Sequence, residues 1–140
     1  RKLYAQDIRG SKAHAAMQRE VVGGRSLRYT WKGSDPSLPA VLLMAHQDVV
    51  PIAPGTEGDW AEAPFAGTLK DGFVWGRGAW DDKANLFAQM EAMELLAAGG
   101  FVPRRAIHLA FGADEGRAAF GSASPRSTFF CKSAGKPSGG

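Results

Sequence analysis

The chain is 140 residues long, 44% hydrophobic and 22% charged, which is the composition of an ordinary globular domain. No apolar stretch approaches the ~20 residues needed to cross a bilayer, so we expect no membrane partner. The formal charge is +3, but residues 1–116 hold all 14 acidic residues and 13 of the 17 basic ones, a net charge of −1, which argues against a nucleic-acid partner.

The first part of the chain predicts a helix followed by two strands. Residues 13–20 have a helix-forming composition, and the pair Gly23-Gly24 readily ends a helix. Residues 27–31 alternate as in a strand, and the Gly, Pro and Ser residues at 33–39 predict a loop. The continuous apolar run at 40–45 suits a strand buried on both faces, as in parallel sheets.

The next part predicts a hairpin and then a strand. A connection at 51–64 is rich in Pro, Gly and Ala, and its tryptophan should anchor it to the body. Residues 65–69 and 73–75 flank a glycine-containing turn, which is typical of a hairpin. A helix is expected from residue 81 to about residue 98 and a buried strand at 105–112. A strand, a helix and a strand in this order predict a right-handed crossover in a largely parallel sheet.

The last 24 residues differ from the rest. Of residues 117–140, 11 are Ser, Gly or Pro, and none is acidic. We therefore divide the chain into a body of residues 1–116 and a low-complexity tail of residues 117–140, which we expect to be poorly ordered.

Imidazole and carboxylate groups follow three apolar runs. His46 and Asp48 come after the first, Asp81 and Asp82 after the second, and Glu115 after the third. All could lie at strand ends along one edge of a sheet, where ligands bind in open α/β folds. Because the chain has a single cysteine, a metal here would be held by histidine and carboxylate groups.

Each of these residues also has a purely structural interpretation. A lone histidine such as His46 is more often a packed group than a ligand, Asp81 and Asp82 could cap a helix, and Glu115 could be an exposed loop acid. If His46 does bind a metal, Asp48 would point to the same side of the strand and could accept its second N–H. Glu115 could then act as a general base in metal-assisted hydrolysis.

Four motifs in unbroken order resemble the aminoacylase and carboxypeptidase family of zinc metallopeptidases, in particular its carboxypeptidase S-like branch. They are MAHQDVVP at 44–51, GDW at 58–60 with PF at 64–65, GRGAWDDK at 76–83, and FGADE at 111–115. The resemblance covers roughly residues 20–116. It implies an α/β fold for residues 1–116: the N-terminal part of a zinc-peptidase catalytic domain, with a mostly parallel sheet flanked by helices.

The resemblance also implies roles for single residues. His46 would bind one of two zinc ions, Asp81 would bridge both, Asp48 would orient His46, and Glu115 would be the general base. Asp82 would follow Asp81 in a cis peptide bond. Cobalt or manganese could replace zinc. The implied reaction is hydrolysis of a peptide or N-acyl amino-acid amide bond beside a free carboxylate, and the substrate would be a small peptide or N-acyl amino acid.

The sequence departs from the family pattern at two positions and in its tail. Gly116 stands where the family has a second, metal-binding Glu, and Ala84 stands where a Gly is usual. The tail does not resemble the family continuation, and the resemblance does not extend to the lid or dimerisation domain that it would imply for relatives.

These departures predict an N-terminal fragment with a disordered or frameshifted tail and little turnover. A homodimer is expected only for the full-length protein. The alternative is a truncated, non-enzymatic family member that acts through association with another chain. The chain begins at Arg1 without a signal-type apolar region, and its compartment stays open.

Overall fold

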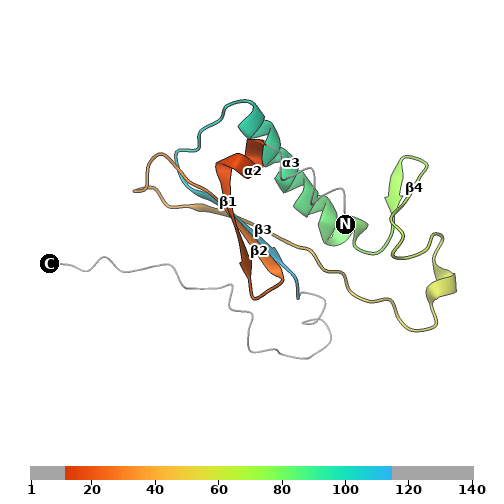
Figure 1. Cartoon of the computed structure of the whole chain (residues 1–140). Coiled ribbons are helices and arrows are strands. Elements are labelled where there is room, and N and C mark those ends of the chain that lie inside the picture. The colour runs from red at the N-terminus through yellow and green to blue at the C-terminus, as the bar shows by residue number, and fades with distance from the viewer. Residues whose placement is uncertain (1–11, 115–140) are drawn as a thin grey trace.

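The computed structural model describes residues 12–114 and shows a sheet with one long helix across a face (Figure 1). Four strands form the main sheet in the order β1-β2-β6-β3, and β4 and β5 form a separate pair. The elements are α2 (Lys12–Ala16), β1 (Met17–Val22), β2 (Ser26–Trp31), β3 (Val41–His46), the 3₁₀ turn η2 (Glu57–Asp59), β4 (Thr68–Lys70), β5 (Phe73–Trp75), the π-helical turn η3 (Ala79–Ala84), α3 (Asn85–Ala98) and β6 (Ile107–Gly112).

The predicted α/β class and the strand–helix–strand unit are confirmed. β3 and β6 pair in parallel, with Val41 opposite Ile107 and His46 opposite Gly112, and α3 connects them. The expectation of a mostly parallel sheet is wrong for the described residues, since β1 pairs antiparallel with β2 and β2 pairs antiparallel with β6. The short β1–β2 connection explains the first of these pairings, because Gly23 and Gly24 adopt φ values of 59° and 77° and allow a tight hairpin turn.

The helix predicted at 13–20 is only half correct. α2 ends at Ala16, and the chain then continues as β1, whose first residue Met17 is buried. Pairing with β2 outweighs the helix propensity of residues 17–20, because strand β1 completes the edge of the sheet. The glycine pair therefore closes a hairpin and does not end a helix.

The core lies between α3 and one face of the sheet. The stripe predicted on α3 is confirmed, since Leu86, Met90 and Met93 are 7%, 6% and 5% exposed. The buried cluster consists of Ala13, Met17, Tyr29, Trp31, Leu86, Met90, Met93, Leu109 and Phe111. This packing fixes α3 against the strands and so fixes where the helix begins relative to the end of β3.

The other face of β3 is open in the described part of the chain. Leu43 and Ala45 pack against the core, whereas Leu42 is 53% and Met44 is 48% exposed. The expectation that this apolar run is buried on both faces is therefore wrong here, because α3 covers one face of the sheet and alternate residues of a strand point to opposite faces.

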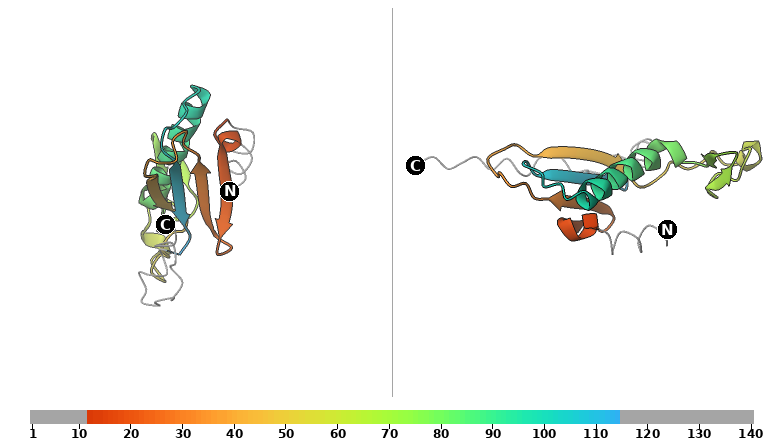
Figure 2. Two further views of the ribbon diagram at one scale, coloured as in Figure 1. Left: turned by 90° about the vertical axis from the view of Figure 1, so that its left-hand side faces the viewer. Right: turned by 90° about the horizontal axis from the view of Figure 1, so that it is seen from above.

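The connection after β3 and the β4–β5 hairpin project beyond the end of the sheet (Figure 2). The hairpin prediction is confirmed, with Asp71 and Gly72 at φ values of 53° and 80° in its turn, although its first strand is Thr68–Lys70 and not residues 65–69. The guanidinium of Arg77 lies 4.9 Å from the centre of the Trp60 ring. The backbone N–H of Arg77 donates to the carbonyl oxygen of Pro64 at 2.6 Å. Trp60 thus contacts Arg77 in the segment between β5 and η3, and its predicted anchoring of the connection to the body stays a prediction.

The long helix ends at Ala98 as predicted but begins later than expected. Residues 79–84 form η3, in which Asp81 and Asp82 have non-helical φ/ψ values, and regular helix starts at Asn85. No helix within residues 12–114 is long and apolar enough to cross a membrane. Glu115, Gly116 and the tail lie outside the described residues, so their predicted roles stay predictions.

Candidate metal centre

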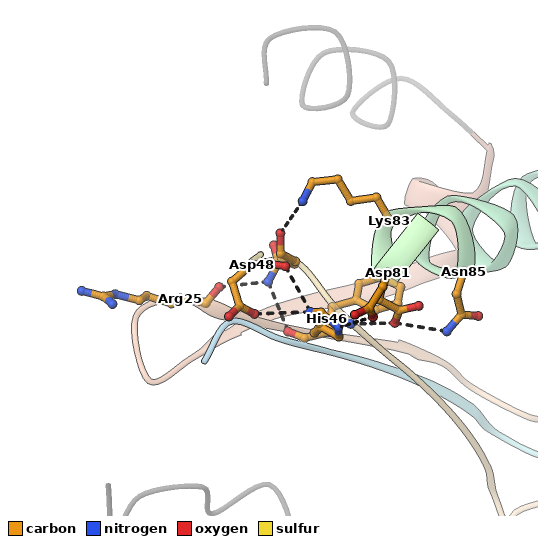
Figure 3. A network of polar contacts seen from close by, with 9 residues as sticks. Arg25, His46, Asp48, Asp81, Lys83 and Asn85 are labelled. Carbon is orange, nitrogen blue, oxygen red and sulfur yellow. Dashed lines mark hydrogen bonds and ion pairs between the residues drawn. The ribbon is translucent and has the colours of Figure 1, made fainter. Parts of the chain in front are cut away.

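The end of β3 meets the turn that precedes α3 (Figure 3). His46 is the last residue of β3, and Asp81 lies in η3. Nε2 of His46 is 3.1 Å from Oδ1 of Asp81. Two of the residues singled out in the sequence, 35 positions apart, are therefore brought into direct contact.

The second nitrogen of His46 faces Asp48. Nδ1 of His46 is 3.1 Å from the backbone oxygen of Asp48 and 3.6 Å from its carboxylate Oδ1. A hydrogen on Nδ1 can donate to that backbone oxygen. With this bond in place, Nε2 could give up its own proton and bind a metal beside Asp81, since a metal at Nε2 needs the Nδ1–H tautomer. The histidine side chain is 19% exposed, whereas that of Asp81 is 80% exposed, so the pair can be reached from solvent.

The charge around His46 favours its protonated form. Burial lowers the pKa of His46, but the hydrogen bond to Asp81, the bond to the backbone of Asp48 and the negative charges of both carboxylates outweigh it, and the pKa lies above its usual value. An environment that stabilises a proton on the imidazole also stabilises another cation beside it.

Asp82 does not cap a helix. Its Oδ2 accepts the backbone N–H of His46 at 3.1 Å and the side-chain amide of Asn85 at 3.2 Å. The N-cap residues of η3 and α3, Gly78 and Ala84, make no side-chain capping hydrogen bond. The peptide bond between Asp81 and Asp82 is cis, as the family resemblance implies. Asp82 therefore links the helix start to the strand end.

Polar side chains from the start of α3 contact the outer edge of β3, which sequence reasoning missed. Asn85 and Gln89 donate to the carbonyl oxygen of Met44 at 3.2 and 2.9 Å, and Lys83 donates to the carbonyl oxygen of Gln47 at 3.0 Å. A signal was present for two of them, since residues 85 and 89 are four apart and therefore share one helix face. The sequence did not indicate which strand this helix face would contact.

The donor types suit zinc, although the described residues supply few of them. An imidazole and a carboxylate are ordinary zinc ligands. Residues 12–114 bring no group of three or more His, Cys, Asp or Glu side chains together as a metal site. β6 ends beside His46, because Gly112 is its partner in the parallel ladder, and Glu115 follows three residues later in the sequence.

Comparison with known proteins identifies the family. The chain matches the model of peptidase family M20/M25/M40 over residues 42–127. The chain belongs to this family. Membership implies a divalent metal, and the match includes the first residues of the segment that we assigned to the tail.

Named relatives agree with the carboxypeptidase S-like resemblance. The chain is 47% identical over 104 residues to carboxypeptidase S of Saccharomyces cerevisiae, covering 73% of this chain and 18% of that protein. It is 48% identical over 99 residues to the Homo sapiens N-fatty-acyl-amino acid synthase/hydrolase PM20D1, covering 71% of this chain and 19% of that protein. The chain thus spans about a fifth of the length of these relatives.

The fold has a solved counterpart. A crystal structure of the M20 family metallo-carboxypeptidase Sso-CP2 from Sulfolobus solfataricus matches with a TM-score of 0.63 at 20% sequence identity, covering 84% of this chain and 26% of that one. The likeness supports the partial M20 fold of the described residues.

Proposed function

We propose that this chain carries part of the metal centre of a zinc-dependent hydrolase that cleaves peptide or N-acyl amino-acid amide bonds. The observation that carries the proposal is the 3.1 Å contact between the His46 imidazole and the Asp81 carboxylate, from two elements joined by the crossover of an M20 fold. The names of the relatives, a carboxypeptidase and an N-fatty-acyl-amino acid synthase/hydrolase, support this substrate class.

Each residue has a distinct task in this proposal. Nε2 of His46 and the carboxylate of Asp81 would hold the zinc, and the 80% exposed side chain of Asp81 would leave its carboxylate accessible for the bridging role that the resemblance implies. Asp48 keeps the imidazole in the Nδ1–H tautomer through the contact at 3.1 Å. Bound zinc supplies a Lewis acid that polarises the scissile carbonyl. Glu115 takes the proton of the attacking water. Cobalt and manganese are the expected substitutes for zinc.

Zinc titration by calorimetry tests the metal centre on the 140-residue chain. We expect micromolar or tighter binding that His46→Ala and Asp81→Ala abolish, since the loss of a ligand costs more than the roughly 10-fold to 100-fold typical of an outer-shell change. His108→Ala is the matched control, because His108 pairs with Leu42 at the opposite end of β3 and bonds to Thr30. No binding, or equal binding by all variants, contradicts the proposal.

One observation favours the alternative of a non-enzymatic chain that associates with another. Leu42 and Met44 leave apolar surface open on β3, and such surface promotes pairing. Concentration-dependent association in sedimentation experiments, without zinc binding or amide hydrolysis, supports this function. Weakening of that association by Leu42→Glu would locate the contact.

A further inference from the structure

Three consecutive residues of the turn before α3 contact the end of β3. Asp81 contacts the imidazole of His46 (Figure 3), Asp82 accepts the backbone N–H of His46, and Lys83 donates to the backbone carbonyl of Gln47. Only the first of these contacts involves a proposed ligand side chain. The other two hold the backbone from which the ligands project.

The direction of the His46 N–H shows why an acceptor is needed. Along the parallel ladder, the N–H of Val41 donates to the carbonyl oxygen of Ala106, just before β6, and the N–H of Gln47 donates to that of Gly112, the last residue of β6. Since successive N–H groups of a strand point to opposite sides, the N–H of His46 points away from β6, toward the outer edge of the sheet. At this edge Asp82 supplies a carboxylate oxygen where a further strand would otherwise supply a carbonyl.

We propose that Asp82 is a positioning residue of the metal centre, whose carboxylate holds the His46 backbone at the separation from Asp81 that zinc needs. This proposal rests on the proposed function. Asp82 acts through His46 and does not itself bind the metal.

The Asp82 carboxylate accepts hydrogen bonds both from His46 at the end of β3 and from Asn85 at the start of α3. Oδ2 of Asp82 accepts the amide of Asn85, and Asn85 also donates to the Met44 oxygen while its own Oδ1 accepts the amide of Gln89 at 3.0 Å. The chain of contacts runs from the second turn of α3 to the backbone of the strand end, and such networks restrain each member more than single bonds do. Asp82 is thus fixed before any metal arrives.

The consequence for zinc follows from geometry. Metal ligands must be held within about 0.5 Å of their productive positions, and the residues behind them provide that precision. Without the Asp82 carboxylate, the outward N–H of His46 loses its acceptor, and the strand end is free to shift relative to η3. The side chains of His46 and Asp81 would still be zinc ligands by type, but the distance between them would no longer be fixed.

Two variants separate positioning from ligation. In Asp82→Asn the amide oxygen can still accept both N–H groups, although it is a poor zinc ligand, whereas Asp82→Ala removes the acceptor. Glu91→Ala is the matched control, since Glu91 is an exposed carboxylate on α3, the helix that follows η3. The first readout is amide hydrogen exchange of the His46 N–H by NMR in metal-free chain. Asp82→Ala should accelerate it by about 10-fold or more, and the other two variants should not.

The second readout is zinc affinity, together with the absorption spectrum of bound cobalt. We expect Asp82→Ala to weaken zinc binding by about 10-fold to 100-fold and to alter the cobalt spectrum, while Asp82→Asn keeps both. Equal losses in Asp82→Asn and Asp82→Ala would make Asp82 a ligand and overturn the proposal, as would unchanged exchange at His46. If Asp82→Ala does not fold, the zinc affinity of Asp82→Asn still decides whether Asp82 is a ligand or a positioning residue. Failure of the unchanged chain to bind zinc would instead contradict the proposed function, and the exchange readout would still decide the role of Asp82.

Discussion

Gly78 lies directly against Val49, so closely that a β-carbon at Gly78 would overlap Cγ1 of Val49. Gly78 has a φ of 78° and precedes Asp81, and Val49 follows His46 in the loop after β3. The two segments that carry the proposed ligands therefore approach each other at a position that only glycine fits, both by its backbone conformation and by the space available.

Gly78→Ala should destabilise the chain. The left-handed conformation costs about 1 kcal/mol for a residue with a β-carbon, and the overlap with Val49 adds roughly 1–3 kcal/mol. We expect the free energy of unfolding, measured with urea, to fall by the sum of these two effects, and zinc affinity to fall with it.

Gly55→Ala separates the two effects. Gly55 has a φ of 84°, and a β-carbon there would meet no atom within 4 Å. It should therefore show the conformational cost of about 1 kcal/mol alone. Equal losses for the two variants would show that the contact with Val49 contributes nothing.

The sequence predicted the part of the site that directly follows an apolar run. His46 ends β3 as expected, and the stripe of Leu86, Met90 and Met93 indicated a helix packed on the sheet. These signals are local, because the hydrophobic period of a strand or helix is visible within a few residues. The expectation that Asp81 lies at a strand end of the same sheet is wrong, because the apolar run before it forms β5, which pairs with β4 in a separate sheet, and Asp81 lies in η3. The crossover that brings the two segments together then follows from their order.

Other features depend on contacts between distant residues and could not be predicted. β1 has the composition of a helix from Met17 to Glu20 and becomes a strand only because β2 lies beside it. Likewise, the bond from the His46 N–H to Asp82 joins residues 36 positions apart. Nothing in the neighbourhood of Asp82 distinguishes a ligand, a cap and an acceptor, since the carboxylate can serve as any of them.

Asp48→Asn should weaken zinc binding only modestly. The closest acceptor for Nδ1 of His46 is the backbone oxygen of Asp48 at 3.1 Å, and this bond survives the substitution. The Asp48 carboxylate oxygen, 3.6 Å from Nδ1, acts on His46 more through its negative charge than through a hydrogen bond. We therefore expect a loss of about 10-fold, the lower end of outer-shell effects, in calorimetric titration. A loss as large as that of His46→Ala would show that Asp48 itself holds the metal.

Trp60→Ala should loosen the long connection after β3. The Trp60 ring lies 4.9 Å from the guanidinium of Arg77, and such pairs contribute about 0.5–2 kcal/mol. The free energy of unfolding should fall by at least that amount, and amides of the connection should exchange faster. Trp80→Ala is the matched control, since that ring is 87% exposed and its removal should change stability little. Equal effects would contradict an anchoring role for Trp60.

Ser37→Ala should raise the pKa of Asp35. The hydroxyl and the backbone N–H of Ser37 donate to Oδ1 of Asp35 at 2.6 and 3.1 Å, and Arg104 lies 3.5 Å from the other carboxylate oxygen. The hydroxyl bond is the largest cause of the lowered pKa of Asp35, followed by the backbone bond. An NMR titration of the Asp35 carboxylate should show the pKa moving toward its usual value in the variant.

The pH dependence of stability gives a second readout of the same bond. Because the pKa of Asp35 is lower in the folded chain than in the unfolded one, its ionised form stabilises the fold above the usual carboxyl pKa, and this contribution disappears as the pH falls through the folded value. Ser37→Ala should therefore be less stable than the unchanged chain near neutral pH and converge with it in acid. Ser34→Ala, at an exposed serine in the same loop, should show no such convergence. A stability difference that is constant with pH would mean that Ser37 acts on the loop and not on the charge of Asp35.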